Sequence, residues 1–388
     1  MALVERSGLD PARLMELRAI MQADIRQQRC LGGVLLVARH GQIGLFEACG
    51  HADDNRMQPV RTDSVFSVLD ITKAFTNVLA LRAVEQGRLT LNTKVVELIP
   101  GFTGRGREHI SLLHLLTHTS GMPGVYSPRT GMNLDSLEQV IAAICEHVYP
   151  AGPPDDKVVH SPMINHALMG EMVRRCDPQG RDYRQLVEQD ILEPLGMHDT
   201  AVGVRRDLAA RHLVPAFLGN ASIDHPGHSN LGPNGAFQEE HAQMPWVGMV
   251  STASDLFRFA EMLRAGGQWE GRRVLAGSTL EWARRCRTGL KPNESYRRLA
   301  ESRGWPLMPA YQGLGFSLRG EELGVTLFGS FTSPGTFGNR GQGSTLYWVD
   351  PQRDLTFVGL STGVMNSGDN IERWQRLSDV ATSAALVS

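Results

Sequence analysis

The segments of this chain that resemble β-strands lie near its two ends, and this placement constrains the fold more than any other feature. Residues 33–38 and 43–48 are short runs of β-type residues joined by a polar turn with a glycine, which predicts a β-hairpin. Strands are also predicted at residues 324–328, 344–349 and 355–360, close to the other end. Because helical patterns fill the region between them, we expect one sheet to form from both ends of the chain.

The region between the two groups of strands is predicted to be mainly helical. Apolar residues at helical spacing cover one face of residues 70–87. Further helices of this region are predicted at residues 112–116, 136–147, 164–175, 183–192 and 253–265. Two more helices are predicted outside it, one that begins at the Asp10-Pro11 cap and one over residues 370–386. We therefore predict an α+β fold in which residues 1–69 and 245–388 form a sheet domain and residues 70–244 form an inserted, mainly helical domain.

A cleft between two such domains is the default place for a binding site. Three segments lack a regular pattern, namely residues 150–156, 225–236 and 288–309. The last two are long loops, and loops of this length often border a functional site. We expect them to lie beside the cleft.

Charge and composition narrow the classes of partner. The 388 residues carry a formal net charge of -2 and contain no basic run, so we expect neither nucleic acid nor a membrane as a partner. No secretory leader and no apolar stretch of about 18 residues is found, which predicts a cytoplasmic protein. The five cysteines are scattered and lack C-x-x-C spacing, so we expect reduced thiols, no metal and no cofactor.

Two neighbouring segments carry a family motif. Residues 66–75 read Phe-Ser-Val-Leu-Asp-Ile-Thr-Lys-Ala-Phe, and residues 84–89 read Val-Glu-Gln-Gly-Arg-Leu. They resemble the nucleophile helix of the serine β-lactamase and penicillin-binding-protein superfamily, which includes class C β-lactamases, D,D-peptidases and related esterases. Similar agreement is found at residues 115–121, 193–197, 248–256 and 347–351. The resemblance implies an antiparallel β-sheet packed by helices, a helical domain beside it, and an active site between the two.

The same resemblance implies three catalytic elements, and this chain departs from each of them. In the S-x-x-K motif Lys73 is present, but Asp70 replaces the serine that would form the acyl-enzyme. His160 falls where the family has a tyrosine. Residues 339–341 fall where the family has Lys-Thr-Gly or His-Thr-Gly, and only the glycine is kept. The candidate catalytic residues are Asp70, Lys73 and His160, and the candidate substrate-binding residues are Asn339, Arg340 and Gly341.

The aspartate changes the chemistry that we expect. A carboxylate that attacks an acyl group forms a mixed anhydride, which is a high-energy intermediate compared with an ester. Asp70 also favours the ammonium form of Lys73, so that the lysine acts as an electrostatic anchor and not as a base. His160, with a usual pKa of about 6.5, suits proton transfer near neutral pH. The guanidinium of Arg340 binds carboxylates or phosphates, so it favours an anionic small-molecule substrate.

Simpler interpretations of these residues remain open. Asp70 precedes a helix and fits an N-cap, where a carboxylate accepts hydrogen bonds from backbone N–H groups. It also fits an introduced substitution, although one change does not explain His160 and residues 339–340. His160 itself fits a structural histidine, and His118 fits a role in holding a turn. Residues 224–228, Asp-His-Pro-Gly-His, lack the helical spacing that aligns two histidines on a metal ion.

Two functions are consistent with this pattern. The first is an enzyme that acts on a small carbonyl-containing substrate by acid–base chemistry, either as a hydrolase or acyltransferase or as a lyase, isomerase or cyclase. The second is a catalytically inactive protein that kept the cleft as a binding site. A serine hydrolase with a mutated nucleophile is a further alternative.

Overall fold

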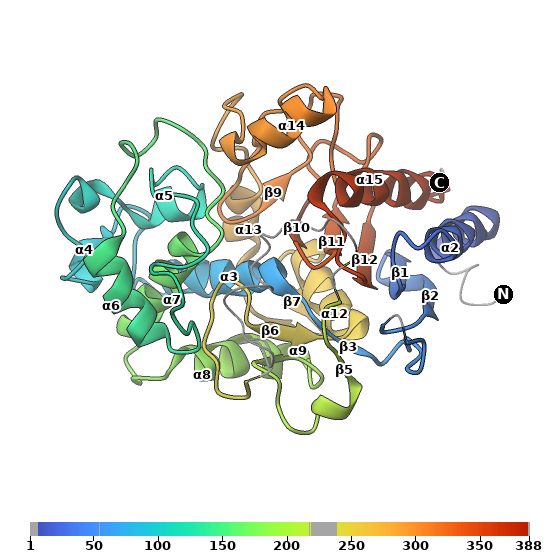
Figure 1. Cartoon of the computed structure of the whole chain (residues 1–388), viewed down its shortest axis with the longest axis horizontal. Coiled ribbons are helices and arrows are strands. Elements are labelled where there is room, and N and C mark those ends of the chain that lie inside the picture. Colours follow the sequence, from blue (N-terminus) through green and yellow to red (C-terminus); the bar gives the residue numbers. More distant parts are fainter. Residues whose placement is uncertain (1–6, 54, 217, 219–238, 387–388) are drawn as a thin grey trace.

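The computed structural model describes residues 7–53, 55–216, 218 and 239–386 (Figure 1). The predicted loop at residues 225–236 and the Asp-His-Pro-Gly-His segment at residues 224–228 lie outside the described residues. Among the helices that are described, none combines the length and the apolar composition needed to cross a membrane. The division of the chain into domains at residues 70 and 244 stays a prediction.

The largest sheet takes its strands from both ends of the chain, as the sequence predicts. Its strand order is β2-β1-β12-β11-β10-β9, and every neighbouring pair is antiparallel. The strands are β1 (Gly32–Arg39), β2 (Gln42–Gly50), β9 (Ser317–Leu318), β10 (Phe337–Gly341), β11 (Thr345–Asp350) and β12 (Leu355–Thr362). The predicted hairpin is therefore confirmed, and its strand β1 also pairs with β12, where Val34 lies opposite Leu360.

Helices cover both faces of this sheet (Figure 1). On one face lie α2 (Pro11–Arg26) and α15 (Ser367–Ser383), which run side by side and pack against Trp348 and Phe357 of the sheet. Helix α2 begins as predicted, because Asp10 accepts a hydrogen bond from the N–H of Ala12. On the other face lies α12 (Ala253–Arg264), which contacts β1, β11 and β12.

The helix that carries the family motif is α3 (Thr72–Glu85). The rings of Phe75 in α3 and Phe259 in α12 stack with 4.2 Å between their centroids. Because α12 rests on the sheet, this contact fixes α3 relative to the strands. Helix α3 also packs against α7 (Ile164–Arg175), so it lies between the sheet and the helical region.

The helical region occupies the left side of Figure 1 and leads into a small sheet. Its remaining helices are α4 (Val95–Leu98), α5 (Leu112–Leu116), α6 (Leu137–His147), α8 (Tyr183–Val187) and α9 (Glu193–Leu195), with a π-turn at Glu188–Leu192 between the last two. The small sheet has the order β4-β6-β3-β5 and consists of β3 (Val65–Ser67), β4 (Ala201–Val202), β5 (His212–Leu213) and β6 (Met249–Ser251). Strand β3 ends shortly before Asp70.

Two predictions about the segment before β10 are wrong. Residues 324–328 form bends and a turn instead of a strand, because the Gln375 side chain of α15 binds their backbone. Its Nε2 donates to the carbonyl oxygen of Gly324, and its Oε1 accepts from the N–H of Thr326. A strand would need such backbone groups for its own ladder.

The segment predicted as a long loop at residues 288–309 contains a 3-10 turn (Glu294–Tyr296) and helix α14 (Arg297–Arg303). Helix α14 ends at Gly304, which adopts a left-handed conformation with φ of 64°. The sequence also did not predict α13 (Gly277–Ala283) or a short hairpin of β7 (Gln268–Trp269) and β8 (Arg272–Arg273), nor did it predict α4, the strands of the small sheet, β9 or β10.

Candidate active site

Asp70 lies between β3 and α3, in a 3-10 turn formed by Leu69–Ile71. The preceding residue, Leu69, has φ of 51°, a left-handed conformation that leucine rarely adopts and that the surrounding structure has to maintain. Strand β3 and most of α3 are buried, so the chain is held on both sides of the turn. The Asp70 side chain is therefore presented at a fixed position.

Both oxygens of the Asp70 carboxylate are bound by donors of the protein. Lys73 Nζ lies 2.6 Å from Oδ1, and the backbone N–H of Gln342 donates to Oδ2 at 3.1 Å. Within the described chain, neither the 3-10 turn nor α3 has a side-chain cap at its start. The N-cap interpretation of Asp70 is therefore wrong, and the carboxylate instead connects α3 to the segment that follows β10.

Lys73 is almost completely buried and uses all three of its N–H groups inside the protein. Besides Asp70 Oδ1, the ammonium contacts His160 Nε2 at 3.2 Å and the carbonyl oxygen of Ser161 at 3.2 Å. An ammonium group has three donors and no acceptor, so His160 Nε2 is the acceptor in this contact. The neutral imidazole consequently carries its hydrogen on Nδ1.

His160 reaches Lys73 from the segment that precedes α7. Its ring centroid lies 4.3 Å from that of His118, and the Nδ1 of His118 accepts a hydrogen bond of 3.1 Å from the N–H of Ser161. The hydroxyl of Ser161 accepts from the N–H of Asn165 at 3.1 Å. His118 therefore holds this turn, as the sequence suggested, and the turn places His160 beside the lysine.

Burial and neighbouring charges set the protonation states of these three groups. Burial opposes ionisation of Asp70, but Lys73 and the N–H of Gln342 outweigh it and lower the pKa of the carboxyl. Burial also lowers the pKa of Lys73, and the expected opposing effect of Asp70 is smaller. Burial and the charge of Lys73 bring the pKa of His160 well below its usual value. Near neutral pH the site thus contains a carboxylate and a neutral imidazole, and its lysine releases a proton more readily than usual.

Strand β10 approaches the Asp70 turn closely at Gly341. A Cβ atom at this position would collide with the carbonyl oxygen of Val68 and with Thr345 Oγ1, so only glycine fits. This close approach brings the N–H of Gln342 to the carboxylate of Asp70. Gly341 therefore shapes the site through its backbone.

The side chain of Asn339 is bonded within the protein at both of its polar atoms. Its Oδ1 accepts a hydrogen bond of 2.8 Å from the hydroxyl of Tyr347, and its Nδ2 donates to the carbonyl oxygen of Gly315 at 3.3 Å. Tyr347 is fully buried. Asn339 is thus tied to the interior, next to the site.

Arg340 is partly exposed and contacts a residue that the sequence did not indicate, Tyr296. Its Nη2 donates to the Tyr296 hydroxyl, and its Cζ lies 5.1 Å from the centroid of the tyrosine ring. Its Nη1 is buried and has no hydrogen-bond partner among the described residues. Arg340 therefore retains an unused donor beside the Asp70–Lys73 pair.

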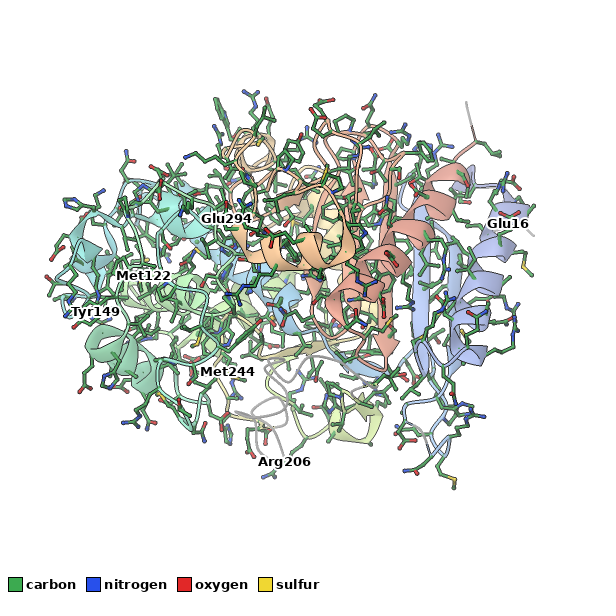
Figure 2. The ribbon with its side chains drawn as sticks, turned by 45° about the horizontal axis from the view of Figure 1, so that its top comes forward. Glu16, Met122, Tyr149, Arg206, Met244 and Glu294 are labelled. Carbon is green, nitrogen blue, oxygen red and sulfur yellow. The ribbon has the colours of Figure 1, made fainter. Side chains whose placement is uncertain are left out.

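Residues 291–296 connect the helical region with strand β10. The N–H of Glu294 donates to the carbonyl oxygen of Val158 at 2.9 Å, and the hydroxyl of Ser295 donates to the carbonyl oxygen of His160 at 3.3 Å. In Figure 2, Glu294 lies between Tyr149 of the helical region and Glu16 of α2. Since the next residue, Tyr296, contacts Arg340, the prediction that this segment borders the site is confirmed.

The structure thus brings Asp70, Lys73, His160 and Arg340 into one site, and it adds residues that the sequence did not identify. Gln342 contributes a backbone N–H, which no side-chain pattern reveals, although the glycines on either side of it point to close packing. Tyr126 contacts the side chain of Gln342, with 3.4 Å between its hydroxyl and Nε2, and lies in a loop without a motif. In the described ranges, no group of three His, Cys, Asp or Glu side chains is arranged to hold a metal ion.

Comparison with known proteins identifies the family. The family model described as Beta-lactamase matches residues 17–382, which is almost the whole chain. The chain belongs to the beta-lactamase family.

Relatives of this beta-lactamase family protein include penicillin-binding proteins and esterases. It is 28% identical to Penicillin-binding protein 4 of Amycolatopsis lactamdurans over 255 residues, which cover 64% of each chain. It is 28% identical to Esterase EstB of Burkholderia gladioli over 287 residues, which cover 66% of this chain and 72% of the esterase. A penicillin-binding protein homologue from Caulobacter crescentus superimposes with a TM-score of 0.78, at 22% identity over 97% of this chain and 98% of the homologue. That likeness shows the fold, an antiparallel sheet packed by helices.

We expect the stability of this beta-lactamase family protein to depend on pH through one partly buried histidine, His212. Burial lowers the pKa of His212 to about 4, while its ring accepts or donates a hydrogen bond of 2.9 Å with Ser67 Oγ. Between this value and the usual one of about 6.5, the unfolded chain binds a proton that the folded chain does not. The free energy of unfolding therefore falls as the pH decreases through this window, by about 2 kcal/mol for this one group between about pH 7 and about pH 5.

The variant His212→Gln keeps a polar group opposite Ser67 and should reduce that loss by about 2 kcal/mol in urea unfolding at the two pH values. The matched control is His147→Gln, at an exposed histidine, and it should leave the difference between the two pH values as it is. An unaltered pH dependence in the His212 variant would show that burial does not keep this imidazole neutral.

Proposed function

We propose that this protein is an enzyme that acts on a small carbonyl-containing substrate, an ester, amide, lactone or thioester, by acid–base chemistry and without a serine acyl-enzyme. One observation carries the proposal, the unbroken chain of contacts from Asp70 Oδ1 through Lys73 Nζ to His160 Nε2, with distances of 2.6 and 3.2 Å. General acid–base catalysis requires groups within such reach of one another and pKa values shifted toward the working pH. Lys73 meets the second condition, because burial lowers its pKa toward neutral pH, whereas His160 and Asp70 meet the condition of reach.

The roles follow from where each group sits. Lys73 is buried and stores the proton, whereas His160 is partly exposed and can meet a substrate. His160 donates its Nδ1 hydrogen to the substrate and receives a proton from Lys73 at Nε2, which leaves a neutral amine. That amine recovers a proton through the same imidazole in the second half of the reaction, and the Asp70 carboxylate stabilises the restored ammonium. The cycle returns every proton, so it suits hydrolysis as well as lyase, isomerase or cyclase chemistry.

Arg340 is the residue that we assign to an anionic group of the substrate. Its guanidinium has an unused Nη1 donor, and guanidinium groups bind carboxylates and phosphates with charge-assisted hydrogen bonds. Asn339 and Gly341 contribute to substrate binding by keeping β10 in position, since one is tied to Tyr347 and the other permits close packing on the Asp70 turn.

A second candidate function is that of a binding protein without turnover. The observation in its favour is that all three N–H groups of Lys73 and both carboxylate oxygens of Asp70 are bonded to protein groups. A substrate gains access to them only by displacing one of these contacts. A cleft closed in this way still offers Arg340 to a ligand.

The proposal is tested with one substrate of each class, p-nitrophenyl butyrate, δ-valerolactone, N-acetylcysteamine thioacetate and p-nitroacetanilide. We expect the protein to turn over at least one of them without forming an acyl adduct in intact-mass spectra. Asp70→Asn and His160→Gln should each lower kcat by about 10²-fold or more, which is the usual contribution of a general acid–base group.

Several results would contradict the acid–base mechanism. Turnover that survives Asp70→Asn, or an acyl adduct on the unmodified protein, would exclude it. Absence of turnover on all four substrates, combined with tight binding of any of them, would favour the second candidate. His40→Gln, at a histidine on the distant β1–β2 turn, is the matched control for His160→Gln and should not change kcat.

A further inference from the structure

A cavity lies outside the Asp70 site, between the end of α2 and the start of α15. Its volume is about 720 Å³, which lies within the range of small-molecule sites. Three arginines line it, Arg29, Arg373 and Arg376, together with residues at the N-terminus of α15. No residue assigned to the proposed function lines this cavity, so it is a separate feature of the molecule.

The three arginines share one carboxylate. Asp24 is 1% exposed and lies 3.2 Å from Arg29 Nη1, 3.3 Å from Arg373 Nε and 2.6 Å from Arg376 Nη2. One negative charge therefore meets three positive charges at this wall. This excess of positive charge favours an anionic ligand, because a wall with equal numbers of positive and negative charges would not attract an anion.

The acidic residues of the cavity are already engaged by another cation. Asp369 and Glu372 lie at the start of α15, and Arg303 of α14 binds them at 2.6 and 3.9 Å. One arginine for two carboxylates leaves one negative charge on this side. Taken over both walls, four arginines face three carboxylates, and the cavity keeps a positive surplus near Arg373.

Arg373 has a donor that the protein does not use. Its side chain is 97% buried, since the residue is 3% exposed, and it donates from Nε to Asp24 and from Nη1 to Ser361 Oγ at 2.9 Å. Its Nη2 is buried and has no hydrogen-bond partner among the described residues. Buried guanidinium nitrogens without an acceptor are rare in folded proteins and call for a bound water or ion.

The N-terminus of α15 adds to the attraction for an anion. This helix is 17 residues long, its N-cap is Asn366, and the N-cap lines the cavity. The first N–H groups of a helix carry partial positive charge. We infer that this cavity is a binding site for a small anion whose carboxylate or phosphate oxygens bind the free donor of Arg373 and the adjoining guanidinium groups.

The inference is tested on the full chain with inorganic phosphate and with succinate as separate probes, by calorimetric titration at constant ionic strength. We expect one of the two probes to bind, and the tighter one identifies the ligand as a phosphate or a carboxylate. Arg29→Gln and Arg376→Gln are the informative variants. These two side chains are half exposed, and the ion pair of Asp24 with Arg373 remains in either variant. Each should weaken binding by about tenfold, the loss of one charge-assisted contact.

Two control variants locate the bound anion. Arg18→Gln alters an arginine of similar exposure on α2 that pairs with Glu47, away from the cavity, and should leave the affinity unchanged. Arg340→Gln removes the anion site that we assign to the candidate active site, so the binding that remains in this variant belongs to the cavity and should keep its affinity. Loss of binding in Arg340→Gln alone, an equal loss in Arg18→Gln, or no binding of either probe would overturn the inference. None of these outcomes depends on turnover, so a failure here is distinct from a failure of the proposed function.

Discussion

Replacement of Lys73 by methionine is expected to lower the free energy of unfolding by about 3–5 kcal/mol, the usual result of removing one partner of a buried ion pair. Lys73 is 2% exposed and Asp70 is 7% exposed, so water does not replace the lost ammonium. The carboxylate would keep the N–H of Gln342 as its bound donor, and a single hydrogen bond does not offset the desolvation of a charge. Urea unfolding of the variant and of the unmodified protein measures the difference.

The double variant Lys73→Met with Asp70→Asn should recover much of the lost stability, because it leaves no buried charge. Lys157→Met, at an exposed lysine, is the matched control and should change stability by less than about 0.5 kcal/mol.

The pH dependence of this loss gives an independent check. Asp70 has a lowered pKa in the folded protein, so its contribution to stability is present above its usual pKa and is lost as the pH falls through the folded value. In Lys73→Met, protonation of Asp70 removes an unpaired buried charge and stabilises the folded protein. The difference in the free energy of unfolding between this variant and the unmodified protein should therefore narrow toward about pH 4. If Lys73→Met lowers the free energy of unfolding by less than about 1 kcal/mol at neutral pH, the Asp70–Lys73 pair is not desolvated.

Replacement of Asp70 by serine is expected to create esterase activity. The change frees the N–H of Gln342, which then points at the position of a carbonyl oxygen bound next to the new hydroxyl. It also removes the charge that raises the pKa of Lys73, so that burial lowers this pKa further and more of the lysine is present as an amine base. We expect Asp70→Ser to hydrolyse p-nitrophenyl butyrate at least about 10²-fold faster than Asp70→Ala, the lower end of what a general base contributes, because only the serine variant has a hydroxyl that Lys73 can activate.

Asp70→Ala is the matched control, because it removes the same charge and frees the same N–H but supplies no nucleophile. A burst of p-nitrophenol and an acyl adduct in the intact-mass spectrum should accompany the activity of Asp70→Ser. Equal rates for the two variants would show that a hydroxyl at residue 70 does not restore hydrolysis in a site that also contains His160 and Asn339. Activity in Asp70→Ser with none in the unmodified protein would favour a mutated serine hydrolase.

The fold was predictable where a segment's local pattern agrees with its surroundings. The hairpin of β1 and β2 and helices α5 and α7 follow the predicted ranges, because their apolar residues match the face that is buried. The prediction failed at residues 324–328, where the Gln375 side chain of α15 binds the backbone of Gly324 and Thr326. A contact of this kind depends on a side chain far along the chain and leaves no periodic signal.

The candidate site was predictable for the residues that carry a motif. Asp70 and Lys73 follow from their spacing on a helix, and His160 follows from the family resemblance, although 87 positions separate it from Lys73. Tyr296 and the backbone of Gln342 were missed because the fold alone brings them to the site. The protonation states were also beyond the sequence, since burial has a larger effect on Lys73 and His160 than their neighbours do.

The order of strands in the large sheet has a consequence for synthesis of the protein. Strand β1 is the partner of β12, and Gly32 lies opposite Thr362, so the second strand of this pair is made long after the first. Contacts that are so distant along the chain form slowly and leave unpaired strand edges exposed until they do. Asp70 likewise meets Gln342 only after β10 has emerged from the ribosome. We therefore expect the nascent chain to need protection by chaperones until β12 is made, and the candidate site to assemble after translation of β10.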